Sequence, residues 1–207
     1  MLYEKCSEVN ADYWQELRQA DPADIRRRTG ITLQDSVWRL PFLNRELTLD
    51  LQQERLWITE APEREPGFRA CLTALLYLLK IDSSALGAPV SPLELTGATI
   101  FFVARGPHAL PNAPLEEIFG SHRPAFLEAG RRLGATEREA GDAALALQVF
   151  PGLTVEVILW EADEEFSAQV SFTVPANLDR FWYLDAVLGL LQLVVRELIA
   201  AYPEASV

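Results

Sequence analysis

The stretch that decides the fold class runs from Asp142 to Val174 and reads DAALALQVFPGLTVEVILWEADEEFSAQVSFTV. Two breaks, Pro151-Gly152 and Ala162–Glu165, divide it into three apolar runs. In the last run, from Phe166 to Val174, every second residue is apolar and the residues between them are polar. That period of two is typical of a strand with one buried face. The stretch therefore predicts three successive antiparallel strands over residues 142–150, 153–161 and 166–174.

Two apolar helices are predicted to pack against this sheet. The last helix covers about residues 178–201 and carries a stripe of large apolar residues, so we expect it to close the core. Residues 68–80 are apolar around most of a helix circumference, which predicts a helix deep in the core. The apolar runs 68–79 and 186–195 are both well short of the roughly 20 residues that cross a bilayer, so neither is a predicted membrane span.

A short helix near the start of the chain has clear boundary residues. Asp21 is a suitable cap, Pro22 fits the first position, and Gly30 ends the helix. The last turn of this helix carries three positive charges, Arg26–Arg28. Such a triplet either binds phosphate or complements the negative carboxyl end of the helix, which is the structural interpretation. Its position in the last turn favours the structural interpretation. Further helices are predicted over about 12–20 and 121–133.

The remaining patterns complete an α+β fold. Residues 36–42, 45–51 and 55–59 predict a three-stranded meander, and residues 99–104 predict an apolar strand. Residues 105–114 hold three prolines and predict a surface segment. We therefore expect antiparallel meander sheets packed against long apolar helices, in a single globular domain over residues 1–207.

The charge of the chain excludes some partners. It has 18 basic and 30 acidic residues, for a net charge of −12. Binding to nucleic acid or to an anionic membrane surface needs a basic face, so we expect neither partner. A protein or small-molecule partner remains.

The two cysteines, Cys6 and Cys71, form no CxxC pair, so the chain by itself builds neither a zinc knuckle nor an iron–sulfur cluster. We expect no disulfide, two unpaired thiols, and no cofactor. The first residues lack the basic and apolar regions of a signal peptide, which predicts a cytoplasmic protein.

The candidate site is an acidic cluster made up of Asp142, Glu161, Asp163, Glu164 and Glu165. A tight turn at Pro151-Gly152 would place Asp142 directly opposite Glu161, and like charges opposed on a ladder are unfavourable without compensation. A cation such as Mg²⁺ or Ca²⁺ would compensate, as would an arginine or a basic partner. The alternative is a solvated acidic turn. Because Glu161 continues the apolar face of its strand, a raised pKa and a role as a general acid are a further possibility.

Motifs of other chemistries are missing. There is no GxSxG elbow, phosphate-binding glycine loop or dinucleotide fingerprint. The only histidines are His108 and His122, too few for a histidine-rich metal site. The aromatic residues Trp160, Trp182 and Tyr183 are interpreted as core or helix anchors.

The carboxyl half resembles the domain-of-unknown-function family DUF3786. The resemblance rests on Gly141-Asp142, Pro151, the stretch Trp160–Phe166 with its acidic residues, Asp21-Pro22, Thr29-Gly30 and Leu76–Leu78. It spans residues 20–202, and the proline-rich region 104–118 departs from the pattern. The family is found mainly in anaerobic bacteria and archaea and has no assigned activity. Some members carry a cysteine-rich iron–sulfur segment, which implies a role near redox or corrinoid enzymes, but the present sequence has no such segment.

Two hypotheses for the function follow. The first is a non-catalytic binding or accessory module that acts on a protein or small ligand in anaerobic metabolism. The second is a metal-assisted enzyme that uses the acidic cluster around Asp142 and Glu161.

Overall fold

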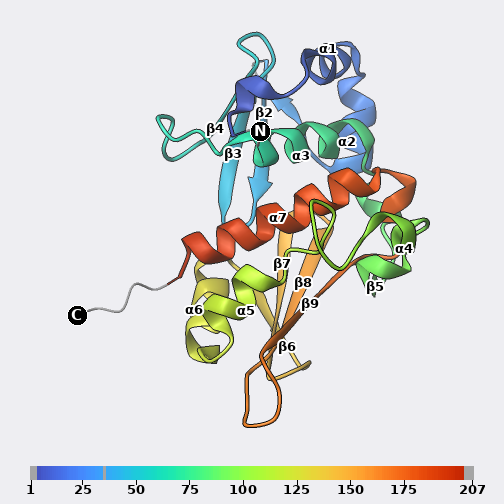
Figure 1. Cartoon of the computed structure of the whole chain (residues 1–207). Helices are drawn as coiled ribbons and strands as arrows, with labels where there is room; N and C mark the ends of the chain where they lie inside the picture. Colours follow the sequence, from blue (N-terminus) through green and yellow to red (C-terminus); the bar gives the residue numbers. More distant parts are fainter. Residues whose placement is uncertain (1–3, 35, 203–207) are drawn as a thin grey trace.

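The computed structural model describes residues 4–34 and 36–202 (Figure 1). Helices and two antiparallel sheets make up an α+β fold, which confirms the predicted fold class. The strands are β1 Leu33–Gln34, β2 Val37–Phe42, β3 Arg45–Asp50, β4 Arg55–Ile58, β5 Pro89–Val90, β6 Thr136–Arg138, β7 Ala143–Phe150, β8 Leu153–Trp160 and β9 Gln169–Pro175. The α-helices are α1 Ala11–Gln19, α2 Pro22–Thr29, α3 Phe68–Lys80, α4 Ala98–Phe101, α5 Ala113–Phe119, α6 Arg123–Arg132 and α7 Leu184–Ala200.

The first sheet has the strand order β1-β2-β3-β4. The predicted meander is present as β2, β3 and β4, and the short β1 adds a strand at its edge. Trp38 pairs with Leu49 and Leu40 pairs with Leu47, and all four side chains are buried. One face of this sheet therefore belongs to the core.

The second sheet has the order β5-β9-β8-β7-β6 and contains the three strands predicted from the carboxyl third. The third of these strands begins at Gln169, not at Phe166 as predicted. Phe166 is 65% exposed because it belongs to a turn that Asp163 holds. The Asp163 Oδ1 atom accepts the backbone N–H groups of Glu165 and Phe166 at 2.8 and 2.7 Å.

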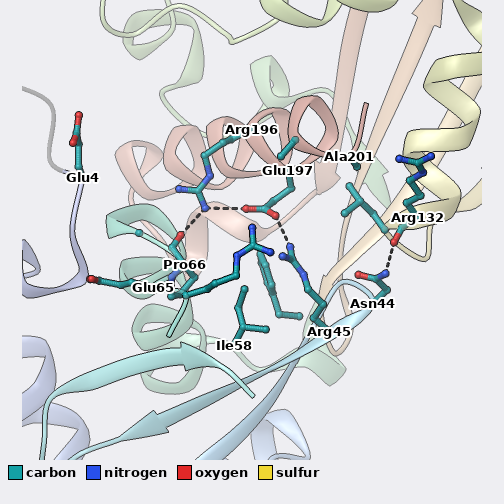
Figure 2. Close-up of a pocket in the computed structure, with 15 residues that line it drawn as sticks. Glu4, Asn44, Arg45, Ile58, Glu65, Pro66, Arg132, Arg196, Glu197 and Ala201 are labelled. Atoms are coloured by element: carbon teal, nitrogen blue, oxygen red, sulfur yellow. Dashed lines mark hydrogen bonds and ion pairs between the residues drawn. The ribbon is translucent and has the colours of Figure 1, made fainter. Parts of the chain in front are cut away.

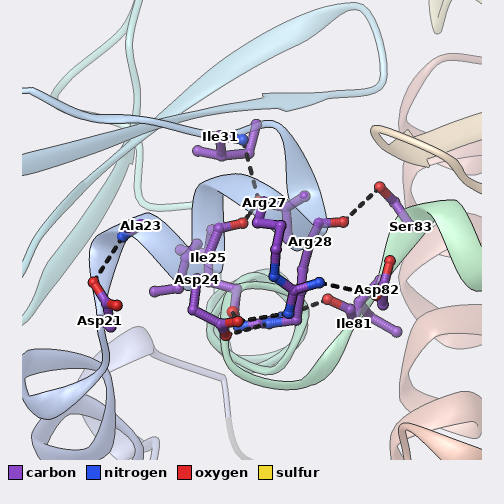
Figure 3. Close-up of polar contacts among 12 residues, drawn as sticks. Asp21, Ala23, Asp24, Ile25, Arg27, Arg28, Ile31, Ile81, Asp82 and Ser83 are labelled. Carbon is purple, nitrogen blue, oxygen red and sulfur yellow. Dashed lines mark hydrogen bonds and ion pairs between the residues drawn. The ribbon is translucent and has the colours of Figure 1, made fainter.

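The helix α2 has the predicted bounds and caps. The Asp21 side chain accepts the N–H of Ala23, and Gly30 follows the helix with a φ of 76°, which favours glycine. Figure 3 shows that the Arg28 side chain points toward Ile81, the residue after the end of α3. It donates to the carbonyl oxygens of Leu78 and Ile81. The structural interpretation of the arginines thus holds for Arg28, although the helix end that it stabilises is that of α3.

The helix α7 runs across the middle of the molecule in Figure 1, with the first sheet above it and the second sheet below. It begins at Leu184, not near residue 178, because Leu178–Arg180 forms a separate 3-10 turn. The expected stripe residues Leu188, Leu191 and Leu198 are buried. This helix contacts α3, so the two helices predicted to be apolar pack against each other.

Of the two predictions between residues 99 and 114, the strand was wrong and the surface segment is confirmed, since residues 105–112 lie outside helices and strands and none of them is buried. Residues 99–104 do not form a strand, because Ala98–Phe101 is the short helix α4. Ala98 and Phe102 are buried one helical turn apart while Ile100 is 87% exposed, a spacing that a strand does not give. The proline-rich segment is followed by α5, whose first turn contains Pro114.

The expectation of two unpaired thiols was also wrong, because Cys6 and Cys71 form a disulfide. The segment before α1 lies against the start of α3, where Phe68 N–H donates to the Glu4 carbonyl oxygen at 2.9 Å. The Cys6 N–H in turn donates to the Glu65 carboxylate. These contacts bring two cysteines separated by 65 positions together with a Cα–Cα distance of 5.4 Å.

The buried apolar side chains form one cluster that extends from Cys6 to Leu198 and includes both sheets. The interpretation of the chain as one domain stays a prediction, and this shared core supports it. Among the residues that the structure describes, no helix combines the length and apolar character needed to cross a lipid bilayer.

Candidate functional site

The acidic cluster predicted from the sequence lies at the open end of the β7–β8 hairpin, but its register differs from the prediction. Phe150 pairs with Leu153, whereas Ala143 pairs with Leu159. The register shifts between Gln148 and Phe150, as in a bulge with one extra residue on β7. Position 142 is therefore across from position 160, and Asp142 does not directly oppose Glu161.

Backbone N–H groups engage three carboxylates of the cluster. The Asp142 Oδ2 atom accepts the N–H of Glu161 at 2.8 Å. The Glu161 Oε1 atom accepts the N–H of Arg123, the first residue of α6, at 2.9 Å. At this position the Glu161 carboxylate also faces the positive end of the helix dipole. Asp142 and Glu161 thus tie the hairpin to α6, which is a structural role.

The other members of the cluster lie in the turn before β9. Two hydrogen bonds lower the pKa of Asp163 below its usual value, because both stabilise the charged carboxylate. The N–H of Phe166 has the larger effect and the N–H of Glu165 the smaller one. The side chains of Glu164 and Glu165 are exposed. Within residues 4–34 and 36–202, no group of three or more histidine, cysteine, aspartate or glutamate side chains is arranged to hold a metal ion. A cation site and a solvated acidic turn both stay predictions for this cluster, and the backbone partners of Asp142 and Glu161 favour the second.

A second candidate is a pocket that sequence analysis did not find. It has a volume of about 630 Å³ and lies between the first sheet, the loop before α3, and the carboxyl ends of α6 and α7. Figure 2 shows residues from all four regions around it. We call it the arginine-lined pocket, since its charged residues include Arg45, Arg64, Arg132 and Arg196, together with Glu197.

Glu197 is the buried charge of this pocket. It lies on α7 and forms ion pairs with Arg45 of β3 and with Arg196 of its own helix, the latter at 2.9 Å. Burying a carboxylate is costly unless it is paired, and two guanidinium partners supply that pairing. The guanidinium of Arg45 also lies 5.5 Å from the centre of the Phe42 ring. These contacts join the first sheet to α7.

The loop before α3 forms another wall of the arginine-lined pocket. Arg196 donates to the Pro66 carbonyl oxygen at 2.7 Å, so α7 is bonded to this loop. Gly67 has a φ of 84°, and a Cβ atom there would lie 2.8 Å from Arg196 Nη1. A side chain at this position would displace Arg196, because the backbone and the guanidinium are in close contact. Arg69 follows at the start of α3, and burial, together with the charge of Arg196, lowers its pKa.

The unpaired groups of the pocket are donors. The Arg45 Nε atom is buried and has no hydrogen-bond partner among the described residues. No hydrogen bond or ion pair within the described chain engages the Arg64 side chain, which is exposed. Across residues 4–34 and 36–202, the Arg132 guanidinium pairs only with Glu128 on its own helix, at 3.3 Å. The site can therefore donate more hydrogen bonds than its own residues accept.

The aromatic and histidine residues noted in the sequence lie elsewhere. Trp182 is buried and donates its indole N–H to the Leu76 carbonyl oxygen at 3.2 Å, as expected of a core anchor. Trp160 and Tyr183 are 40% and 89% exposed, so neither is a core anchor, although Tyr183 stands at the N-cap position of α7. His108 is exposed and stacks on the Phe101 ring with centroids 4.3 Å apart.

The comparison with family models gives the evolutionary context. Residues 21–197 match the model of a domain of unknown function, DUF3786. The chain belongs to this family. The match confirms the resemblance, which covered residues 20–202 and therefore already included α2 and the first sheet. It includes every arginine of the arginine-lined pocket, whereas Cys6 lies before it.

No curated protein and no solved structure matched the DUF3786 chain in the other two comparisons. The geometry of the arginine-lined pocket is thus the main basis for proposing a function.

Sequence reasoning missed this pocket because its residues come from four separate segments. Each of the four arginines stands beside only one or two other charged residues of its segment, as ordinary surface arginines do; they are Arg45, Arg64, Arg132 and Arg196. One signal was available. Arg196-Glu197 interrupts the apolar pattern of the last helix, and Glu197 falls one residue before the expected buried Leu198.

Proposed function

We propose that this DUF3786 protein is a non-catalytic binding module whose ligand occupies the arginine-lined pocket. As implied by the family resemblance, it would act on a protein or small ligand in anaerobic metabolism. The volume of about 630 Å³ is in the range of small-molecule sites. The pocket also combines charged residues with an apolar wall of Phe42, Ile58 and Leu133, as ligand sites commonly do.

The residue types that line the arginine-lined pocket support a non-catalytic role. Among the described residues, no serine, threonine, cysteine, lysine, tyrosine or histidine lines the pocket. Those are the usual nucleophiles and proton carriers near neutral pH. Glu197, the buried carboxylate, is already engaged in ion pairs with Arg45 and Arg196 that join the first sheet to α7. Binding is the activity that this set of residues supports best.

The test is to recover a ligand and to show where it binds. The tagged protein is purified from its native host grown anaerobically, and the eluate is analysed by native mass spectrometry and for co-purifying proteins. Ala200→Trp fills the mouth of the pocket, and Ala104→Trp, at an exposed position away from it, is the matched control.

We expect the wild type and Ala104→Trp to retain the same ligand and Ala200→Trp to lose it. Equal retention by all three proteins would place the site elsewhere. The absence of any ligand or partner from the wild type would contradict a binding module.

A further inference from the structure

The arginine-lined pocket has more hydrogen-bond donors on its guanidinium groups than its carboxylates can accept. Four arginines and three glutamates line it, in a chain whose net charge is −12. Two of the three carboxylates are already engaged, since Glu197 pairs with Arg45 and Arg196 and Glu65 accepts the N–H of Cys6. Figure 2 shows the third, Glu4, at the edge of the pocket and apart from the arginines. The carboxylates present therefore do not satisfy the guanidinium groups.

Structural roles explain only part of this arginine set. The pair with Glu197 accounts for Arg45 and Arg196, and the end of α6, where a cation is favoured, accounts for Arg132. Neither explanation covers Arg64, whose side chain has no bonded partner among the described residues. The buried Nε–H of Arg45 likewise has no acceptor among the described residues. The exposed guanidinium groups of Arg64 and Arg132 are the donors that a molecule in the pocket can reach.

We propose that the arginine-lined pocket binds the oxyanion of a small molecule, a carboxylate or a phosphate, through Arg64 and Arg132. This inference rests on the proposed function and names the class of its ligand. Guanidinium groups match such oxyanions because several N–H groups of fixed geometry face the oxygen atoms. The apolar wall formed by Phe42, Ile58 and Leu133 favours a ligand that also has an apolar group beside its oxyanion. The ligand is therefore an amphipathic organic anion.

The test uses phenyl phosphate and benzoate as probes, with the neutral benzamide as a control of similar shape. Binding is measured by isothermal titration calorimetry at low ionic strength. Arg64→Gln and Arg132→Gln are combined in one variant, since both side chains are exposed and neither bonds to a buried group through its guanidinium. Arg18→Gln with Arg105→Gln, two exposed arginines outside the pocket lining, is the control with the same change in net charge.

We expect both anions to bind and benzamide not to bind. Each pocket arginine removed is expected to weaken binding of the anions about tenfold, or about 1.4 kcal/mol, because a charge-assisted hydrogen bond is lost. The control pair is expected to leave the affinity within about twofold at matched salt. Circular dichroism spectra and melting temperatures show whether both variants are folded.

Two outcomes would overturn the inference and leave the proposed function intact. In the first, benzamide binds as tightly as benzoate and Ala200→Trp abolishes that binding, so the neutral probe occupies the pocket. In the second, the native ligand of the pocket carries no oxyanion. An equal loss of affinity in the control pair would show that only the overall charge matters, which also overturns it. Anion binding that Ala200→Trp leaves unchanged would count against the pocket itself, and hence against both proposals.

Discussion

Reduction of the disulfide between Cys6 and Cys71 is expected to destabilise the protein strongly. The bond joins residues 65 positions apart, so it restricts the unfolded chain much more than the folded one. In the loop-entropy description a closed loop of this length lowers the entropy of the unfolded state by about 14 cal/mol/K, or about 4 kcal/mol at 25 °C. For a chain of this size each kcal/mol shifts the melting temperature by about 2–4 °C. The expected decrease is therefore roughly 8–16 °C.

The assay is differential scanning calorimetry with and without a phosphine reductant. Both cysteines are buried, so the reductant is applied in mild denaturant and then removed, and a thiol titration checks that two thiols have formed. The double variant Cys6→Ala with Cys71→Ala is the control. It should melt near the reduced wild type and should not respond to reductant.

A fully reduced wild type that melts within about 2 °C of the oxidised protein would refute the entropic reasoning. Two free thiols in the protein as purified under air would refute the disulfide itself. The prediction also bears on the expected cytoplasmic location, because a reducing compartment would favour the less stable dithiol form.

Three further predictions concern single elements of the fold. The double variant Asp142→Asn with Glu161→Gln is expected to lower the free energy of unfolding by about 1 kcal/mol, since both carboxylates accept backbone N–H groups. Mg²⁺ should not change the melting temperature of the wild type or of the variant. A melting-temperature shift with Mg²⁺ that only the wild type shows would instead establish a cation site. Leu191→Asp should cost about 3–5 kcal/mol or prevent folding, because Leu191 is fully buried, whereas near-wild-type urea denaturation would mean that α7 is placed wrongly. Burial raises the pKa of Tyr77, so its neutral form is favoured in the folded state. The contribution of Tyr77 to stability should therefore be constant below about pH 10 and should fall by up to about 1.4 kcal/mol per pH unit above it. Tyr77→Phe should cost about 1 kcal/mol at pH 7, by leaving the Pro151 carbonyl oxygen without its donor, and should flatten the alkaline loss; an unchanged alkaline slope would contradict this assignment.

The parts of the fold that follow from local patterns were predictable. The helix over 68–80 has its predicted bounds because its apolar residues cover most of the circumference and a Pro-Gly pair precedes it. The caps Asp21 and Gly30 identify α2, since each is suited to its position by its own chemistry. The alternation of β8 likewise gives the buried face of the second sheet.

The features that sequence reasoning missed depend on contacts between distant segments. One extra residue near Val149 shifts the pairing of the whole hairpin, and nothing in the apolar pattern indicates it. The Cys6–Cys71 bond depends on how the amino-terminal segment packs on α3. The arginine-lined pocket is assembled from four segments in the same way. For the acidic cluster, the charges were identified but the register that separates Asp142 from Glu161 was not.

The most direct test of the central claim is an NMR measurement of the arginine side chains. The ¹H–¹⁵Nε spectrum is recorded while phenyl phosphate is added, with assignments from single Arg→Lys variants. The account predicts that the signals of the pocket arginines shift together with one dissociation constant while that of Arg18 stays in place; these arginines are Arg45, Arg64, Arg132 and Arg196. Signals that move only outside this set, or that do not move at saturating ligand, would contradict the account.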